Sequence, residues 1–305
     1  MPEPGPGYRR SDVRLGSHRV NSSVAPLAGP LVTAQVRVIL PTKGWVPLRL
    51  DRIWRYRELL YFLAWRDIKV RYKQTALGVA WAVLQPVLTM AIFAVVFGQV
   101  VGVKTGSVPY PLFAFTALVP WTLFSYALTQ SSSSLVDSAN LIRKIAFPRL
   151  VIPIAASLAG LVDFVISFMV LLLLLMHYRH VPDVTILLLP FLIALALAAA
   201  LAVGIWLSAL NVQYRDVRYA IPFLAQIWLY ATPIAYPMSL VHGRLRLILS
   251  LNPMTGVTDG FRSVLLRSGS IDTVTLVVSS VVTLLLLLSG LFYFRRMEQT
   301  FADVV

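Results

Sequence analysis

The pattern of apolar and polar positions divides this chain into long apolar stretches separated by short polar ones. A helix advances about 1.5 Å per residue, so about 20 apolar residues are needed to cross the hydrocarbon layer of a membrane. Six stretches come close to this length, and the fifth is the shortest: residues 77–103, 111–130, 151–176, 184–210, 219–236 and 274–294. The pattern therefore predicts an all-α integral membrane protein with six transmembrane helices, occupying residues 77–305.

The segment before the first span, residues 51–76, has the pattern of an amphipathic helix. Its aromatic residues share one narrow stripe at about 100° per residue: Trp54, Tyr61, Trp65 and Tyr72. Cationic side chains lie beside that stripe: Arg55, Arg66, Lys69 and Lys73. Rings and long cationic side chains suit the headgroup layer of a membrane, where water meets hydrocarbon. We expect an interfacial helix on the cytoplasmic surface; a helix packed on the protein's own loops is the alternative.

Two further elements are predicted outside the spans. Residues 140–150, NLIRKIAFPRL, form a short basic helix that Pro148 ends. In the longest outer segment Asn252 is a suitable N-cap and Pro253 occupies the first helical position, followed by apolar residues at helical spacing. We expect short re-entrant helices at 245–251 and 252–267, which dip into the outer leaflet before the last span. An amphipathic helix on the outer surface is the alternative.

Composition and charge support a membrane protein and orient it. Hydrophobic residues make up 58% of the chain and charged residues 13%, which a soluble fold could hardly cover with polar surface. With the amino terminus inside, 21 of the 27 lysines and arginines lie on the cytoplasmic side. Both termini are then cytoplasmic, and residues 1–50 form a flexible basic tail. The net charge of +14 fits anionic lipid headgroups better than nucleic acid, because the cations crowd beside the predicted spans.

Several kinds of chemistry are absent from the sequence. The chain has no cysteine, no phosphate-binding P-loop motif, and no pair of aspartates spaced for metal-dependent glycosyl transfer. His177 and His180 lie on a short outer loop, where solvated side chains are favoured over a metal site. Asp163 falls near mid-depth of the third span, where an ionisable group is costly. A structural hydrogen bond to a neighbouring helix is favoured for it over a role in transport.

Four segments resemble the permease subunit of ABC-2 type polysaccharide exporters, which move O-antigen, capsule, teichoic acid and related lipid-linked glycans. They are RDIKVRYKQTALGVAWAVLQP (66–86), NLIRKIAFPRLVIP (140–153), NVQYRDVRY (211–219) and NPMTGVTDGFR (252–262). The resemblance covers the chain from about residue 50 to its end. The tail before residue 50 is longer than the family leads us to expect.

The resemblance implies a homodimer in the cytoplasmic membrane of a bacterium, bound to two separate ATPase subunits. This chain would then be a transport subunit rather than an enzyme, without a cofactor, and its partners would bind ATP and Mg²⁺. Residues 140–150 would form the coupling helix that docks on the ATPase. Its contact residues are expected to be Asn140, Arg143, Lys144, Phe147 and Arg149.

From these elements we expect a pathway for a polyprenyl-pyrophosphate-linked glycan. Cations beside the interfacial helix would attract the pyrophosphate: Arg66, Lys69, Arg71 and Lys73. Aromatic faces would line a channel for the sugars: Phe93, Phe97, Trp121, Tyr126, Trp228, Tyr230 and Tyr236. The outer helices would close the exit, with Asn252, Pro253, Phe261 and Arg262 as the gate.

Three other functions stay open from the sequence. An ABC-2 permease for a drug or another lipid would share the six-span plan. A membrane-embedded glycosyltransferase would act on the same lipid carrier, but it would need clustered acidic residues at a membrane interface. A scaffold for a glycan-synthesis complex would bind no ATPase subunit.

Overall fold

The computed structural model of this chain describes residues 50–73, 78–214, 216–267 and 271–298. These residues form helices joined by turns and loops, and no β-strand occurs among them, so the predicted all-α class is confirmed. The described helices belong to one compact unit, Lys43–Val305. Apart from Leu50, the predicted basic tail lies outside the described residues.

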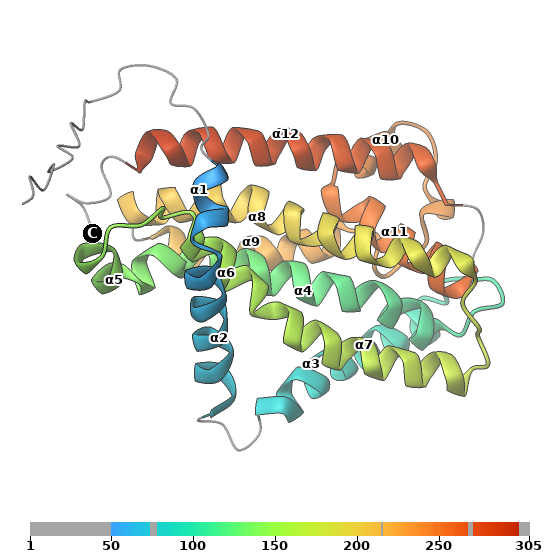
Figure 1. The fold of residues 1–305 in the computed structure, drawn as a ribbon. Coiled ribbons are helices and arrows are strands. Elements are labelled where there is room, and N and C mark those ends of the chain that lie inside the picture. The colour runs from blue at the N-terminus through green and yellow to red at the C-terminus, as the bar shows by residue number, and fades with distance from the viewer. Residues whose placement is uncertain (1–49, 74–77, 215, 268–270, 299–305) are drawn as a thin grey trace, which may run out of the picture. The chain divides into compact units, whose positions relative to one another are not determined.

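The segment predicted to be an interfacial helix is helical and forms two helices joined by a single residue: α1, Leu50–Arg55, and α2, Arg57–Lys73. Figure 1 shows both in blue, crossing the long helices rather than running along them. Leu63 is buried and anchors α2 on the bundle. The stripe's first three aromatic side chains face away from the bundle and are 72%, 68% and 45% exposed: Trp54, Tyr61 and Trp65.

The long helices pack around α4. Most side chains of this helix are buried, and it lies against α3, α6, α7, α8, α9 and α11. After α2 the described helices follow in this order: α3 (Gly78–Phe93), the π-helical η1 (Ala94–Val100), α4 (Tyr110–Asp137), α5 (Ala139–Lys144), α6 (Val151–Leu158), α7 (Gly160–His177), η2 (Val184–Leu188), α8 (Leu189–Gln213), α9 (Val217–Ala231), η3 (Met238–Leu240), α10 (Arg244–Ser250), α11 (Pro253–Leu266) and α12 (Thr273–Met297).

The contact between α4 and α8 depends on small and polar residues. At Gly204 a Cβ atom would lie 1.9 Å from the Oγ and 3.1 Å from the Cβ of Ser131, so a larger residue requires the Ser131 side chain or the helices to shift. Two turns later the side-chain amide of Asn211 donates to the backbone carbonyl of Ser132 at 3.1 Å. Small residues let helix backbones approach closely in lipid, where hydrophobicity alone does not drive helices together. This contact holds α4 at the centre of the bundle.

Five helical segments of the described chain are long and apolar enough to cross a membrane: Ala80–Val100, Tyr110–Asp137, Val151–His177, Val184–Gln213 and Thr273–Met297. They match five of the six predicted spans. The remaining predicted span, residues 219–236, overlaps α9, which has only 15 residues. This length corresponds to about 22 Å of helix, less than the hydrocarbon layer is thick. The predicted span at residues 219–236 is therefore not confirmed.

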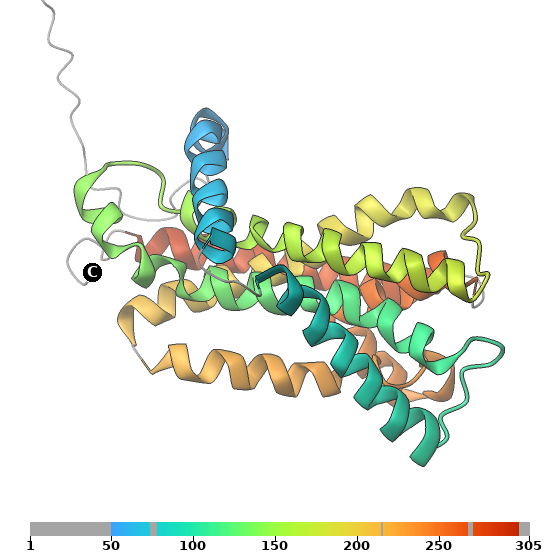
Figure 2. The ribbon, with the colours of Figure 1, turned by 90° about the horizontal axis from the view of Figure 1, so that it is seen from below.

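Ion pairs distinguish the two ends of the bundle. At one end a guanidinium nitrogen of Arg218, in the first turn of α9, lies 3.6 Å from a carboxylate oxygen of Asp137, which ends α4. At the other end Arg246 of α10 pairs at 2.5 Å with Asp272, the N-cap of α12. We call these the Asp137 end and the Asp272 end. Figure 2 shows α9 running back from the first toward the second, beside the long helices.

Candidate functional site

A cavity of about 460 Å³ lies among the end of α2 and helices α3, α4, α7 and α9. Three aromatic residues line it: Trp81, Trp121 and Tyr126. Hydroxyl and amide side chains on α4 add polar lining: Thr122, Ser125, Thr129 and Gln130. Gln85 and Thr89 of α3 and Gln226 of α9 also belong to the polar lining. Such a mixture of rings and hydrogen-bonding groups, set within an apolar bundle, suits a ligand with both hydroxyl groups and apolar faces.

An ion pair and a hydrogen bond join the last turn of α2 to Asp163 of α7. A guanidinium nitrogen of Arg71 lies 2.5 Å from one carboxylate oxygen, and the hydroxyl of Tyr72 donates to the other. Burial, and then the hydrogen bond to Asp163, raise the pKa of Tyr72 above its usual value, so the phenol stays a donor. The hydrogen bond to a neighbouring helix that the sequence predicts for Asp163 is therefore present.

The ring of Tyr126 forms the cavity wall beside this ion pair. The guanidinium carbon of Arg71 lies 4.5 Å from the ring centre, within the range of a cation–π contact. Gly160 of α7 touches the same ring, and a Cβ atom there would lie 2.4 Å from its Cδ1. Helix α7 can therefore approach α4 this closely only because position 160 has no side chain.

The seven candidate channel aromatics do not form one surface. Trp121 and Tyr126 line the cavity. Trp228 lies behind Phe124, with ring centres 5.0 Å apart, and Phe124 in turn lies 5.2 Å from Trp121. Trp228 therefore supports the wall rather than facing the cavity.

The other candidate aromatics lie elsewhere. Phe93 and Phe97 pack edge to face on each other, with ring centres 5.3 Å apart. Tyr230 is 60% exposed, and Tyr236 is partly buried near α11, where its backbone carbonyl accepts a hydrogen bond from Arg262.

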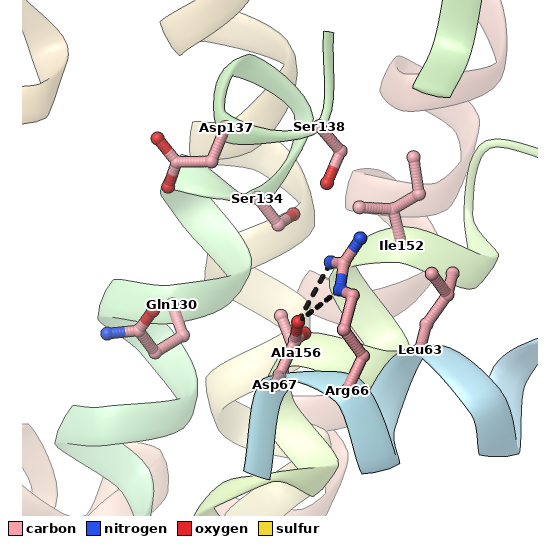
Figure 3. Close-up of a pocket in the computed structure, with 9 residues that line it drawn as sticks. All are labelled: Leu63, Arg66, Asp67, Gln130, Ser134, Asp137, Ser138, Ile152 and Ala156. Carbon is pink, nitrogen blue, oxygen red and sulfur yellow. Dashed lines mark hydrogen bonds and ion pairs between the residues drawn. The ribbon is translucent and has the colours of Figure 1, made fainter. Parts of the chain in front are cut away.

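The four cations predicted to attract pyrophosphate also separate. Of these four, Arg71 lines the large cavity. Arg66 lines a smaller pocket of about 170 Å³ and pairs with Asp67 at 2.8 Å; Figure 3 shows both in front of the end of α4. The Lys69 ammonium lies 5.4 Å from the centre of the Trp65 ring. Lys73 is exposed.

The segment predicted to couple to an ATPase projects at the Asp137 end. Its helix, α5, covers Ala139–Lys144, shorter than the predicted 140–150. Ile142 is buried and anchors it, and Arg149 donates to the backbone carbonyl of Glu298 at 2.7 Å. Phe147 is partly buried and packs on the apolar cluster that contains Ile142. The polar side chains of α5 are exposed: Asn140 before Ile142, and Arg143 and Lys144 between the two anchors.

Helix α11, predicted as an outer helix, begins where the sequence predicts. The Asn252 side chain accepts a hydrogen bond from the backbone N–H of Met254 at 3.0 Å, and Pro253 follows at the first helical position. Asn252 also accepts from the Trp228 indole at 2.8 Å, so the cap joins α11 to α9. The two other candidate gate residues, Phe261 and Arg262, are buried. They are part of the packed core at the Asp272 end.

The polar face of α4 was not singled out from the sequence, although a signal for it exists. Thr122, Ser125 and Thr129 recur at helical spacing inside an apolar span. Polar residues repeated on one face of a membrane helix indicate a protein-facing or water-facing surface.

Comparisons with known proteins agree with this architecture. The family model described as ABC-2 type transporter matches residues 58–266. An O-antigen export system permease protein, RfbA, from Myxococcus xanthus is 30% identical over 261 residues, which cover 85% of this chain and 100% of the relative. A protein of the same name from Klebsiella pneumoniae is 27% identical, over 81% of this chain and 95% of the relative. The polysialic acid transport protein KpsM of Escherichia coli is 21% identical, over 77% and 91%. This chain belongs to the ABC-2 type transporter family.

Proposed function

We propose that this chain is the permease subunit of an ATP-driven exporter that moves a polyprenyl-pyrophosphate-linked polysaccharide across the cytoplasmic membrane of a bacterium. The relatives are named for O-antigen export and for polysialic acid transport, and both cargoes are glycans. The observation that carries the proposal is the cavity beside Arg71. Its rings can stack on sugar faces, its hydroxyl and amide groups can bond to sugar hydroxyls, and its guanidinium can bind a phosphate.

The energy would come from a separate ATPase subunit that binds ATP and Mg²⁺, because the chain contains no phosphate-binding loop. The exposed part of α5 is the surface on which that subunit would dock. It projects from the Asp137 end and is anchored by Ile142 on one side and by Arg149 on the other. A push on this element would therefore pass directly to α4 and α6.

A second copy of the chain would complete the pathway. The cavity lies between α3 and α9, and both helices leave apolar side chains exposed beside it. On α9 these residues share one face: Tyr219, Phe223, Ile227 and Tyr230. Two copies related by a two-fold axis would enclose a conduit between these faces, flanked by two ATPase subunits.

We place the Asp137 end in the cytoplasm, together with both termini, because the short loops there carry five lysines and arginines, against two, Lys104 and Arg179, in the short loops at the other end. Helix α9 is the return crossing needed between α8 and α12, with residues 232–236 completing it in non-helical form. Non-helical backbone is tolerated at membrane depth where protein surrounds it. The exposed rings of α1 and α2 would lie among the cytoplasmic headgroups, and α10 and α11 would close the outer side.

Reconstitution tests this function. The permease is purified from native cells with its associated proteins, placed in liposomes and supplied with a lipid-linked glycan. We expect an ATPase subunit to co-purify, and the glycan to stimulate its hydrolysis. Arg71→Gln should lower the stimulation by about tenfold, since one charge-assisted phosphate contact contributes ~1.5–3 kcal/mol. Lys69→Gln removes the same charge outside the cavity and should have a much smaller effect.

Two results would contradict the proposal. A stable complex without a nucleotide-hydrolysing partner would favour a scaffold. Stimulation by a drug or a simple lipid, but not by the glycan, would favour a permease for other cargo.

A further inference from the structure

Asp163 pairs with Arg71, the cation that the proposed function needs for binding pyrophosphate. The side chain of Asp163 is 18% exposed and that of Arg71 is 39% exposed, and both line the cavity. A carboxylate inside a membrane protein is costly unless it is paired. An anionic ligand that enters the cavity must therefore compete with Asp163 for the guanidinium of Arg71.

Competition of this kind discriminates between ligands by charge. Anionic lipids of the bilayer carry a phosphodiester with a single negative charge. A pyrophosphate carries more negative charge and more acceptor oxygens, so it can bind the guanidinium fork in two places. A carboxylate paired at 2.5 Å raises the affinity that any competing anion needs, and this favours the pyrophosphate over the phosphodiester.

Tyr72 continues to donate a hydrogen bond to Asp163 when the ion pair opens. Its hydroxyl donates to one carboxylate oxygen of Asp163, and a guanidinium nitrogen of Arg71 pairs with the other. The displaced carboxylate therefore keeps a hydrogen-bond donor, which lowers the cost of the exchange.

We propose that Asp163 is a specificity-determining residue: a displaceable counter-charge that keeps bulk anionic lipids off Arg71 and yields it to a lipid-linked pyrophosphate. This inference rests on the proposed function and adds a means of selection to the same site. Arg71 is the binding group, and Asp163 acts only through it.

Binding of farnesyl pyrophosphate to the full-length permease in nanodiscs tests the inference. In phosphatidylcholine discs, Asp163→Asn should tighten binding about tenfold, as expected if Asp163 leaves Arg71 accessible about a tenth of the time. Adding phosphatidylglycerol should weaken binding strongly in Asp163→Asn and little in the wild type. Asp163→Ser, which also removes the charge, should behave in the same way and serves if the asparagine variant does not fold.

The double variant Asp163→Asn, Arg71→Gln tests whether Asp163 acts only through Arg71. It should bind as weakly as Arg71→Gln alone, because the carboxylate acts through the arginine. Lys69→Gln is the control for loss of one positive charge on the same helix.

Three outcomes would overturn parts of this account. Equal or weaker binding by both Asp163 variants would show a purely structural carboxylate, and would leave the proposed function standing if Arg71→Gln still binds poorly. No effect of Arg71→Gln would remove the anion site itself. Inorganic pyrophosphate that binds as tightly as the farnesyl form would indicate a soluble anion and overturn the assignment to a lipid.

Discussion

The guanidinium carbon of Arg262 lies 3.6 Å from the centre of the Phe113 ring, so a buried cation of α11 rests on an aromatic face of α4. The same guanidinium donates to the carbonyls of Pro233 at 2.6 Å and Ile234 at 2.5 Å, and its Nε donates to the carbonyl of Phe113 at 3.3 Å. These acceptors belong to a non-helical segment and to the start of α4. One side chain thus joins three parts of the Asp272 end.

Replacing Arg262 by methionine should destabilise the protein by about 3 kcal/mol or more, because buried carbonyls lose a charged donor while the volume is roughly kept. Thermal unfolding in detergent measures the loss. Arg267→Met is the matched control: Arg267 is exposed and lies 3.9 Å from Asp183, so its removal should cost ~0.5 kcal/mol or less. Equal effects of the two substitutions would show that the buried contacts do not carry the stability.

Gly160→Ala tests the close approach of α7 to Tyr126. Replacing glycine by alanine within a helix stabilises by up to ~1 kcal/mol, but at Gly160, the first residue of α7, the added Cβ would lie 2.4 Å from the ring. We expect a net loss of about 1–3 kcal/mol from overpacking. In a Tyr126→Ala background the same change should be neutral or stabilising, which a double-mutant cycle of unfolding free energies would detect. Simple additivity of the two changes would contradict the clash.

Asn252→Ala tests the joint between α11 and α9. The substitution removes an N-cap and leaves the Trp228 indole without its acceptor, so we expect a loss of about 2 kcal/mol. Asn252→Asp keeps the acceptor for both donors but loses the hydrogen bonds that the side-chain amide donates to the Thr232 hydroxyl and the Ala231 carbonyl, and it should cost less. The order of the apparent Tm values, wild type above aspartate above alanine, checks the assignment; an aspartate variant no better than alanine would contradict it.

Much of the helical architecture could be predicted from the sequence, because apolar length and capping residues are local signals. Five spans and the start of α11 at Asn252 and Pro253 are where the pattern places them. The predicted fifth span was too long. Residues 232–236 are largely apolar, yet they leave the helix. Their carbonyls accept hydrogen bonds from Arg262, which is 28 residues beyond Ile234 in the sequence. An apolar run cannot reveal so distant a donor.

The site was harder to predict, because its members come from different helices. The four candidate cations lie close together in sequence, but a helix points neighbouring side chains in different directions. Only the structure shows that Arg71 faces the cavity while Arg66 faces another pocket. Likewise, Tyr72 and Asp163 are 91 residues apart, so neither residue alone indicates the other.

The exposed cations of α5 provide the last prediction. Arg143 and Lys144 project between the anchors of the segment and belong to the surface proposed to meet the ATPase subunit. Reversing both charges, Arg143→Glu and Lys144→Glu, places like charge where complementary charge is expected, and it should weaken co-purification of the ATPase subunit by about tenfold or more. Thermal stability of the isolated permease should change little, because both side chains are exposed.

The control makes the same charge change away from this surface. Lys104 and Arg179 are exposed and lie on loops at the Asp272 end, away from α5, so reversing both charges should leave the complex intact. Affinity purification at two salt concentrations separates the cases, because screening weakens an attraction between exposed charges. Equal loss of the ATPase subunit in both double variants would indicate an effect of net charge alone. Full retention in the α5 variant would place the docking surface elsewhere and remove the mechanical link from α5 to α4.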